Sequence, residues 1–202
     1  MAPNLFQHAQ EVVMAEETAK LFLNKSINEV TIKDIATHLG VGEATIYRHF
    51  DTKYNIVLSV ARYLQTKMLS GYYNLSNCKT GYEKIEKFYK SFLSIYKDNP
   101  RYYKFINEFD AFILTNRTVN ISSYEEGIDV FKDIFFEAYN LGLKDGTIKK
   151  MDNIDNFYFA TTHALLGLCK KLADKDIISQ DKSLDKGREI EVLIDTILYR
   201  LK

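Results

Sequence analysis

The sequence predicts an all-α protein of about nine helices, and three observations support this prediction. Only two Pro and nine Gly occur among the 202 residues, so helix-breaking residues are scarce. Apolar residues recur at intervals of three and four along most of the chain. No segment sustains the alternation of apolar and polar residues that is typical of strands.

The first four expected helices follow closely on one another. They cover residues 6–22, 31–39, 42–50 and 53–68. Thr31, followed three residues later by Asp34, is a capping pattern for the second helix, and Thr52 is placed to cap the fourth. Gly40 should end the second helix, because helices often stop at a residue in the left-handed conformation that glycine adopts cheaply.

Five longer helices are expected in the rest of the chain, separated by loops rich in Asn, Asp, Lys and Gly. They cover residues 81–97, 101–115, 123–143, 153–173 and 187–201. This spacing divides the chain into two expected domains. Residues 1–52 form a small domain of three helices, and residues 53–202 form a larger helical domain.

Residues 31–50 have the pattern of a helix-turn-helix unit. Ala36 is small enough for two helices to cross, Gly40 permits the turn, and Val41 and Ile46 are expected to fill the angle between the helices. With Ile46 and Phe50 facing inward, the outer face carries Glu43, Ala44, Thr45, Tyr47 and Arg48. A short helix with a small polar face fits a DNA major groove. The alternative is an ordinary surface helix of an all-α domain.

The segment TIKDIATHLGVGEATIYRHFDTKYNIVLSV, preceded by AKLFLNKSINEV, resembles the tetracycline-repressor (TetR) family of bacterial transcription regulators. The matching positions are Thr31, Ile35, Ala36, Gly40, Val41, Thr45, Ile46, Tyr47, His49, Phe50 and Lys53. The resemblance covers about 55 of the 202 residues. Two departures are Gly42, where the family usually has Ser, and Tyr54-Asn55, where it usually has acidic residues.

The resemblance implies a role for each polar residue of this segment. Phosphate contacts are expected from Lys33, Tyr47, His49 and Lys53. Thr31 is mainly a cap, although its position lies near the DNA backbone in the family. Base edges are expected to meet Glu43, Ala44, Thr45 and Arg48. His49 has packing within the domain as its alternative. The full expected DNA-binding set is Thr31, Lys33, Gly42, Glu43, Ala44, Thr45, Tyr47, Arg48, His49 and Lys53.

The charge of the chain gives no support for a nucleic-acid partner. The formal net charge is zero, and residues 1–55 hold five Lys or Arg against seven Asp or Glu. DNA binding would therefore depend on local placement of a few cations rather than on bulk charge. This neutrality favours the rival hypothesis, a helical small-molecule or lipid-binding protein with a vestigial helix-turn-helix.

Aromatic residues are concentrated in the larger half of the chain. Such rings usually belong to a core, but they also suit the walls of a ligand cavity. The expected pocket residues are Phe88, Phe92, Tyr96, Tyr103, Phe105, Phe109, Phe112, Phe131, Phe135 and Tyr139. The modest inference is a hydrophobic or aromatic effector. Glu108 and Asp110, which lie among the rings, would also suit a lipophilic cation.

The last two helices, within residues 153–201, predict a homodimer. The final helix carries Ile190, Leu193, Ile194, Ile197, Leu198 and Leu201, a wider apolar surface than one core contact needs. The helix before it lines up Ala160, Ala164 and Gly167, which would allow close approach of another helix. A four-helix interface across a two-fold axis would use both features. Burial of the same residues inside one monomer is the alternative.

Other classes of protein find little support. Four scattered His show no catalytic or metal-binding spacing, and no phosphate-binding glycine loop is present, so we expect no catalytic residues, no metal and no cofactor. Cys78 and Cys169 lie far apart in the sequence and show no pairing pattern. A reduced cytoplasm is the simplest location for such cysteines. No signal peptide or membrane-spanning apolar run is expected. The sequence thus predicts a cytoplasmic, ligand-responsive regulator, most simply a repressor that binds a palindromic double-stranded DNA operator as a dimer.

Overall fold

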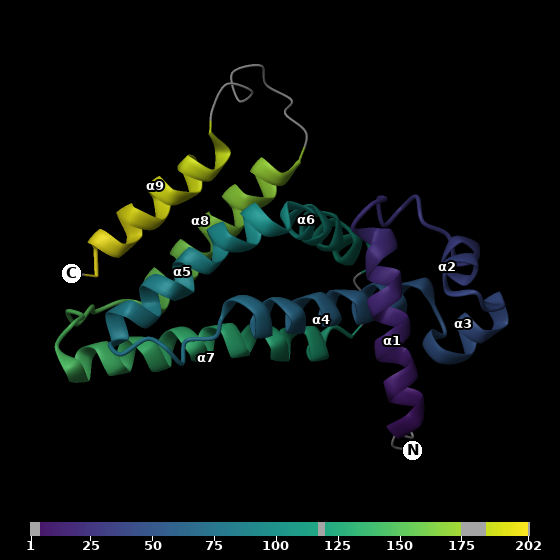
Figure 1. Ribbon diagram of the computed structural model, residues 1–202, viewed down its shortest axis with the longest axis horizontal. Coiled ribbons are helices and arrows are strands. Elements are labelled where there is room, and N and C mark those ends of the chain that lie inside the picture. Colours follow the sequence, from purple (N-terminus) through teal and green to yellow (C-terminus); the bar gives the residue numbers. More distant parts are fainter. Residues whose placement is uncertain (1–4, 117–119, 175–184, 202) are drawn as a thin grey trace. The chain divides into compact units, whose positions relative to one another are not determined.

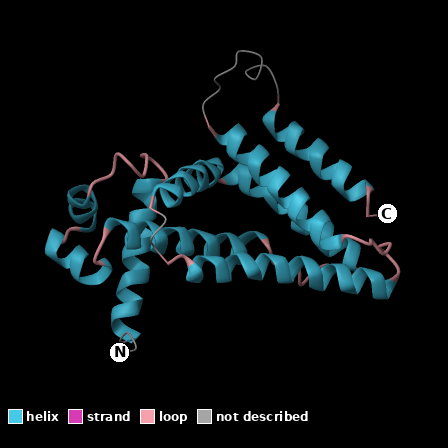
Figure 2. Ribbon diagram, turned by 180° about the vertical axis from the view of Figure 1, so that it is seen from behind, coloured by secondary structure: helices cyan, strands magenta, loops and turns pink. Residues whose placement is uncertain are grey.

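The computed structural model describes residues 5–116, 120–174 and 185–201, and within these ranges it contains nine helices and no strand (Figure 1 and Figure 2). The helices are α1 (Leu5–Phe22), α2 (Ile32–Leu39), α3 (Glu43–Phe50), α4 (Lys53–Tyr72), α5 (Gly81–Asp98), α6 (Pro100–Thr115), α7 (Ser122–Asp145), α8 (Ile154–Ala173) and α9 (Lys186–Tyr199). The predicted all-α class is confirmed, and the predicted ranges differ from these bounds by only a few residues.

The helix ends follow the local signals of the sequence. Thr31 forms a complete capping box with Asp34, and Gly40 ends α2 in the left-handed conformation at φ 67°. The hydroxyl of Thr52 accepts the Asn55 N–H at 3.3 Å, as expected of a cap for α4. These ends are set by contacts between residues no more than four positions apart, which explains why the sequence predicts them well.

The chain packs as two compact units, and each is described on its own. The first unit comprises Met1–Lys67 and Lys104–Gly127, and the second comprises Met68–Tyr103 and Ile128–Lys202. These are units of packing and do not coincide with the expected functional domains of residues 1–52 and 53–202. The boundary between those domains stays a prediction.

In the first unit, α1, α2 and α3 pack against one another in all three pairings. Aromatic rings from other helices complete its core. Phe22 stacks on Phe105 with 6.2 Å between ring centroids, and Tyr54 stacks on Phe112 at 5.6 Å. The helix pair α2–α3 is therefore mounted on a core that includes residues far along the chain.

In the second unit, α5 packs against both α8 and α9. The start of α5 lies very close to α7, since a Cβ on Gly81 would collide with the backbone nitrogen of Gly142. Only glycine permits this approach at residue 81. Many rings of the aromatic-rich region pack in this core, including Phe88 and Phe135, whose centroids are 5.6 Å apart.

Helix α9 uses most of its apolar residues inside the monomer. The buried ones are Ile190, Ile194, Ile197, Leu198 and, just beyond the helix, Leu201. The expectation that these residues supply an intermolecular face is therefore wrong, because they pack into the core of the second unit. Among the described residues of α9, Val192 and Tyr199 are the exposed large hydrophobic side chains.

Candidate nucleic-acid interface

The turn between α2 and α3 is held by backbone contacts and a few apolar anchors. The Val41 N–H donates to the Ala36 carbonyl at 3.0 Å, which closes the end of α2 around Gly40. Ala36 and Ile46 are buried, as predicted, but Val41 is 37% exposed. The expectation that Val41 fills the angle between the helices is wrong. Its side chain instead lines a surface groove beside α1.

Helix α3 exposes one polar face and buries only Ile46 and Phe50. The exposed side chains are Glu43, Ala44, Tyr47 and Arg48, while Thr45 is half-buried and Gly42 is the exposed N-cap. Because no large side chain other than Tyr47 and Arg48 protrudes from this face, the helix is narrow enough to approach base edges in a groove. The structure thus places Glu43, Ala44 and Arg48 of the predicted reading residues on one accessible surface, whereas Thr45 faces the groove beside α1.

The start of α2 supplies two more predicted residues. Lys33 is exposed in the first turn of the helix. Thr31 is exposed but occupied, since its hydroxyl accepts the Asp34 N–H at 3.1 Å and donates to the Asp34 carboxylate at 2.6 Å. The bond that the Thr31 hydroxyl donates, together with one from the Thr31 N–H at 2.8 Å, lowers the pKa of Asp34, because both favour the ionised carboxylate. Thr31 therefore acts primarily as the cap that fixes where α2 begins.

His49 lies on the inner side of α3 rather than on its exposed face. Its side chain is only 7% exposed, and Nδ1 lies 3.8 Å from the Glu11 carboxylate on α1. The buried Nδ1 has no hydrogen-bond partner among the described residues. This placement matches the alternative of a packed histidine better than a phosphate contact.

Lys53, the first residue of α4, is partly buried and bound to the loop that precedes α2. Its ammonium donates to the Ile27 carbonyl at 2.5 Å. Burial lowers the pKa of Lys53, since desolvation disfavours the charged form, although the nearby Asp34 opposes this shift. An ammonium has three donors, so this hydrogen bond leaves two for a phosphate.

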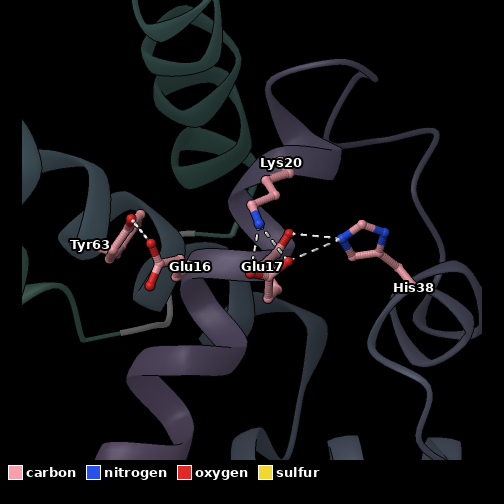
Figure 3. Close-up of polar contacts among 5 residues, drawn as sticks. All are labelled: Glu16, Glu17, Lys20, His38 and Tyr63. Atoms are coloured by element: carbon pink, nitrogen blue, oxygen red, sulfur yellow. Dashed lines mark hydrogen bonds and ion pairs between the residues drawn. The ribbon is translucent and has the colours of Figure 1, made fainter.

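Adjacent glutamates of α1 reach in different directions and tie the helix to its neighbours (Figure 3). Glu16 accepts a hydrogen bond from the Tyr63 hydroxyl of α4 at 2.7 Å. Burial, reinforced by this bond, raises the pKa of Tyr63 to about 12. Glu17 pairs with Lys20 at 2.6 Å, and its backbone carbonyl lies 3.1 Å from Nε2 of His38 on α2. A carbonyl only accepts, so Nε2 of His38 carries the proton.

The predicted pocket residues do not all belong to one compact unit. Seven lie in the second unit, namely Phe88, Phe92, Tyr96, Tyr103, Phe131, Phe135 and Tyr139, while Phe105, Phe109 and Phe112 lie in the first. Most are buried among other rings, as core residues are. Their role as pocket walls stays a prediction.

Two polar residues near these rings have roles that the sequence did not reveal. The buried hydroxyl of Tyr54, stacked on Phe112, has no hydrogen-bond partner among the described residues. The Glu108 carboxylate accepts the Ile27 N–H at 2.8 Å. The signal for Tyr54 was its departure from the acidic residue usual at that position, whereas no local pattern pairs Glu108 with residue 27.

Comparison with known proteins identifies the helix-turn-helix segment. Residues 16–60 match the model of the bacterial regulatory proteins of the tetR family. Over residues 16–60 the chain is similar to the tetR family, and the predicted resemblance is confirmed. The matched segment contains the helix-turn-helix formed by α2 and α3. No curated protein matches the sequence.

Solved structures share this tetR-family fold over nearly the whole chain. The regulator PfmR from Thermus thermophilus is 17% identical, with 94% of this chain and 98% of that one covered and a TM-score of 0.64. FadR from Bacillus subtilis, solved with stearoyl-CoA, is 14% identical, with 94% of this chain and 98% of that one covered and a TM-score of 0.63. A putative transcriptional regulator from Saccharomonospora viridis, solved with choline, is 18% identical, with 96% of this chain and 98% of that one covered and a TM-score of 0.75. At these identities the likeness shows the fold alone.

No described helix is both long and apolar enough to cross a membrane. Within the described residues, no three His, Cys, Asp or Glu side chains are grouped as metal ligands would be. Cys78 and Cys169 are both free thiols.

Proposed function

We propose that this protein is a ligand-responsive transcriptional repressor that binds a palindromic DNA operator as a homodimer. The observation that carries the proposal is the outer face of α3, where Glu43, Ala44, Tyr47 and Arg48 are exposed on a helix anchored by Ile46 and Phe50. Arg can bridge guanine O6 and N7, Glu can accept from cytosine N4, and Ala can contact a thymine methyl group. Lys33 at the start of α2 and the two remaining donors of Lys53 would contact phosphates.

The homodimer is supported by exposed side chains on α8 and α9. Phe159, Val192 and Tyr199 are large hydrophobic residues left in solvent. Ala160, Ala164 and Gly167 are also exposed along α8, where small side chains let another helix approach closely. A dimer that reads successive major grooves of a palindrome needs its two copies of α3 about 34–36 Å apart.

A small hydrophobic or aromatic effector is supported, within the first unit, by the rings of α6 and by the unpaired hydroxyl of Tyr54, whose ring stacks on Phe112. A ligand with one polar group could satisfy that hydroxyl while its apolar part contacts rings. The stearoyl-CoA and choline complexes of FadR and of the S. viridis protein support a small-molecule effector in general. A coupling of roughly 1–3 kcal/mol between effector and operator would weaken DNA binding about 5- to 150-fold.

Selection of bound sequences from random double-stranded DNA tests the proposal. We expect enrichment of a palindrome whose half-sites are separated by about one helical turn. Recovery of no sequence above background, together with tight binding of an apolar ligand, would instead favour a helical small-molecule carrier with a vestigial helix-turn-helix. The acidic excess in residues 1–55 is the feature that favours this second candidate.

A further inference from the structure

The loop between α1 and α2 is held at one residue by two ionised side chains. The Ile27 N–H donates to the Glu108 carboxylate of α6 at 2.8 Å, and the Ile27 carbonyl accepts the Lys53 ammonium of α4 at 2.5 Å. The side chain of Ile27 is itself buried. All three residues belong to the first compact unit. We refer to Glu108, Ile27 and Lys53 together as the loop clamp.

The loop clamp satisfies backbone groups that no helix can satisfy. Ile27 lies outside α1 and α2, so its N–H and carbonyl have no helical partners. A buried backbone group without a partner costs free energy, so these two hydrogen bonds stabilise the loop at Ile27. Lys104, one turn before Glu108, lies 4.0 Å from the carboxylate.

The position of Ile27 determines how the chain enters the helix-turn-helix. Only three residues separate Ile27 from Thr31, the N-cap of α2, and Val30 among them is fully buried. With the loop held at residue 27, the start of α2 has little freedom. Because α2 and α3 are joined by a short turn and packed on each other, the orientation of α3 follows from that of α2.

We propose that Glu108 is a positioning residue for DNA binding, which acts through Ile27 to hold the α2–α3 pair in its reading orientation. This inference rests on the proposed DNA-binding function. It places a determinant of operator affinity on α6, outside residues 16–60 that match the tetR-family model. The carboxylate is needed here as a hydrogen-bond acceptor of the right reach, rather than as a charge.

If Glu108 acted only through its charge, its removal would strengthen DNA binding rather than weaken it. Removal of a negative charge from a DNA-binding domain ordinarily tightens its binding to DNA of any sequence, because repulsion of phosphates is relieved. If Glu108 positions the loop, removal of its acceptor weakens operator binding despite the relief of charge. The sign of the change therefore separates the two roles.

Two substitutions separate charge from reach. Glu108→Gln removes the charge but keeps an oxygen in place to accept the Ile27 N–H. Glu108→Asp keeps the charge but withdraws the oxygen by one methylene. We expect Glu108→Gln to bind the selected operator within about threefold of wild type and Glu108→Asp to lose roughly tenfold or more. The same pair at the exposed Glu126 of α7 serves as the matched control and should change operator affinity little.

Hydrogen exchange at the Ile27 amide reports the loop clamp directly in the full-length protein without DNA. Exchange should accelerate in Glu108→Asp, stay close to wild type in Glu108→Gln, and be unchanged in the core of α4 in both. Comparable thermal unfolding of the two variants would show that the fold is retained. A Glu108→Asp variant that unfolds would show that the whole fold depends on this contact, and it would overturn the specific positioning role.

The reverse ranking, with Glu108→Asp binding as tightly as wild type and Glu108→Gln altered, would overturn the inference. Equal losses in both variants would also overturn it, because an acceptor at the right reach would then be insufficient. A wild-type protein that selects no DNA overturns the proposed function and this inference together. That outcome is distinct, because it appears before any variant is made.

Discussion

Helices α3 and α9 differ in how well the sequence predicts which of their sides is buried. Helix α3 has two buried apolar anchors, Ile46 and Phe50, and polar or small residues elsewhere. Helix α9 carries apolar residues on more than one side, with Ile194 and Leu198 buried and Val192 51% exposed. When only one side of a helix is apolar, its outer face can be read from the spacing. When several sides are apolar, only packing shows which of them is left free.

The largest expected effect tests the inward side of α9. Ile194 is 1% exposed, so Ile194→Glu places an unpaired charge in the core of the second unit. We expect a loss of at least about 3 kcal/mol in the free energy of unfolding. Val192→Glu is the matched control on the exposed side and should leave the fold intact while weakening the proposed dimer.

Denaturant unfolding and sedimentation of both variants, at equal protein concentration, would measure these changes. Wild-type stability in Ile194→Glu would show that the inward and outward sides of α9 are assigned wrongly. A Val192→Glu variant that remains as fully dimeric as wild type would place the dimer surface elsewhere.

The next effect compares the two sides of α3. Ile46→Ala should cost about 2–5 kcal/mol in the free energy of unfolding, because it leaves a cavity between α2 and α3. Arg48→Ala should change stability by less than about 0.5 kcal/mol and weaken operator binding by roughly 1–3 kcal/mol. Unfolding curves and operator titrations of the two variants make the comparison. Equal stability losses would contradict the division of α3 into a core side and a reading side.

A smaller effect separates phosphate contacts from base contacts beside α3. Lys33→Ala should weaken binding to all DNA sequences by a similar factor and lower the salt dependence by about one counterion per subunit. Glu43→Ala should weaken operator binding while leaving binding to random DNA unchanged or tighter. Titrations of operator and random DNA at two salt concentrations measure both. A change of sequence preference in Lys33→Ala alone would show that the docking is wrong.

The smallest effect concerns the cap of α2. Thr31→Ala should cost about 1 kcal/mol of stability, because the Asp34 N–H loses its acceptor. The pKa of Asp34 is lowered in the folded protein, so the stabilising contribution of its carboxylate is complete above the ordinary value of 3.8 and is lost as the pH falls through the lower folded value. Unfolding of wild type and Asp34→Asn between pH 2 and 6, a range chosen to span roughly the titration of carboxyl groups, would show this loss in wild type alone.

Local patterns account for most of what could be predicted about the fold. The apolar spacing located all nine helices of the described chain, and the cap of α2 at Thr31 and its end at Gly40 follow from neighbours in sequence. The exposed face of α3 was predictable for the same reason. The burial predicted for Val41 was wrong. Its position in the turn suggests a side chain packed between α2 and α3, whereas the side chain lines a groove beside α1.

The site residues divide in the same way. Glu43, Ala44, Tyr47 and Arg48 lie where their helical positions predict. His49 shares that helix, but its surroundings depend on Glu11 of α1, and no rule of spacing reports that contact. Aromatic content predicted a ring-rich larger half, but only the packing showed that Phe105, Phe109 and Phe112 belong to the first unit.

Sequence alone determined each helix to within a few residues and which side of α3 faces outward, because these features depend on side chains and backbone groups within one or two turns. Tertiary structure alone decided which side of α9 is buried, and it alone brought Glu108 to the backbone of Ile27, 81 positions away. A contact at that separation is made only when several helices pack together, and the energies that select it are spread over the whole core. The residues that we propose to read DNA are thus encoded locally, while the residue that we infer to position them is not.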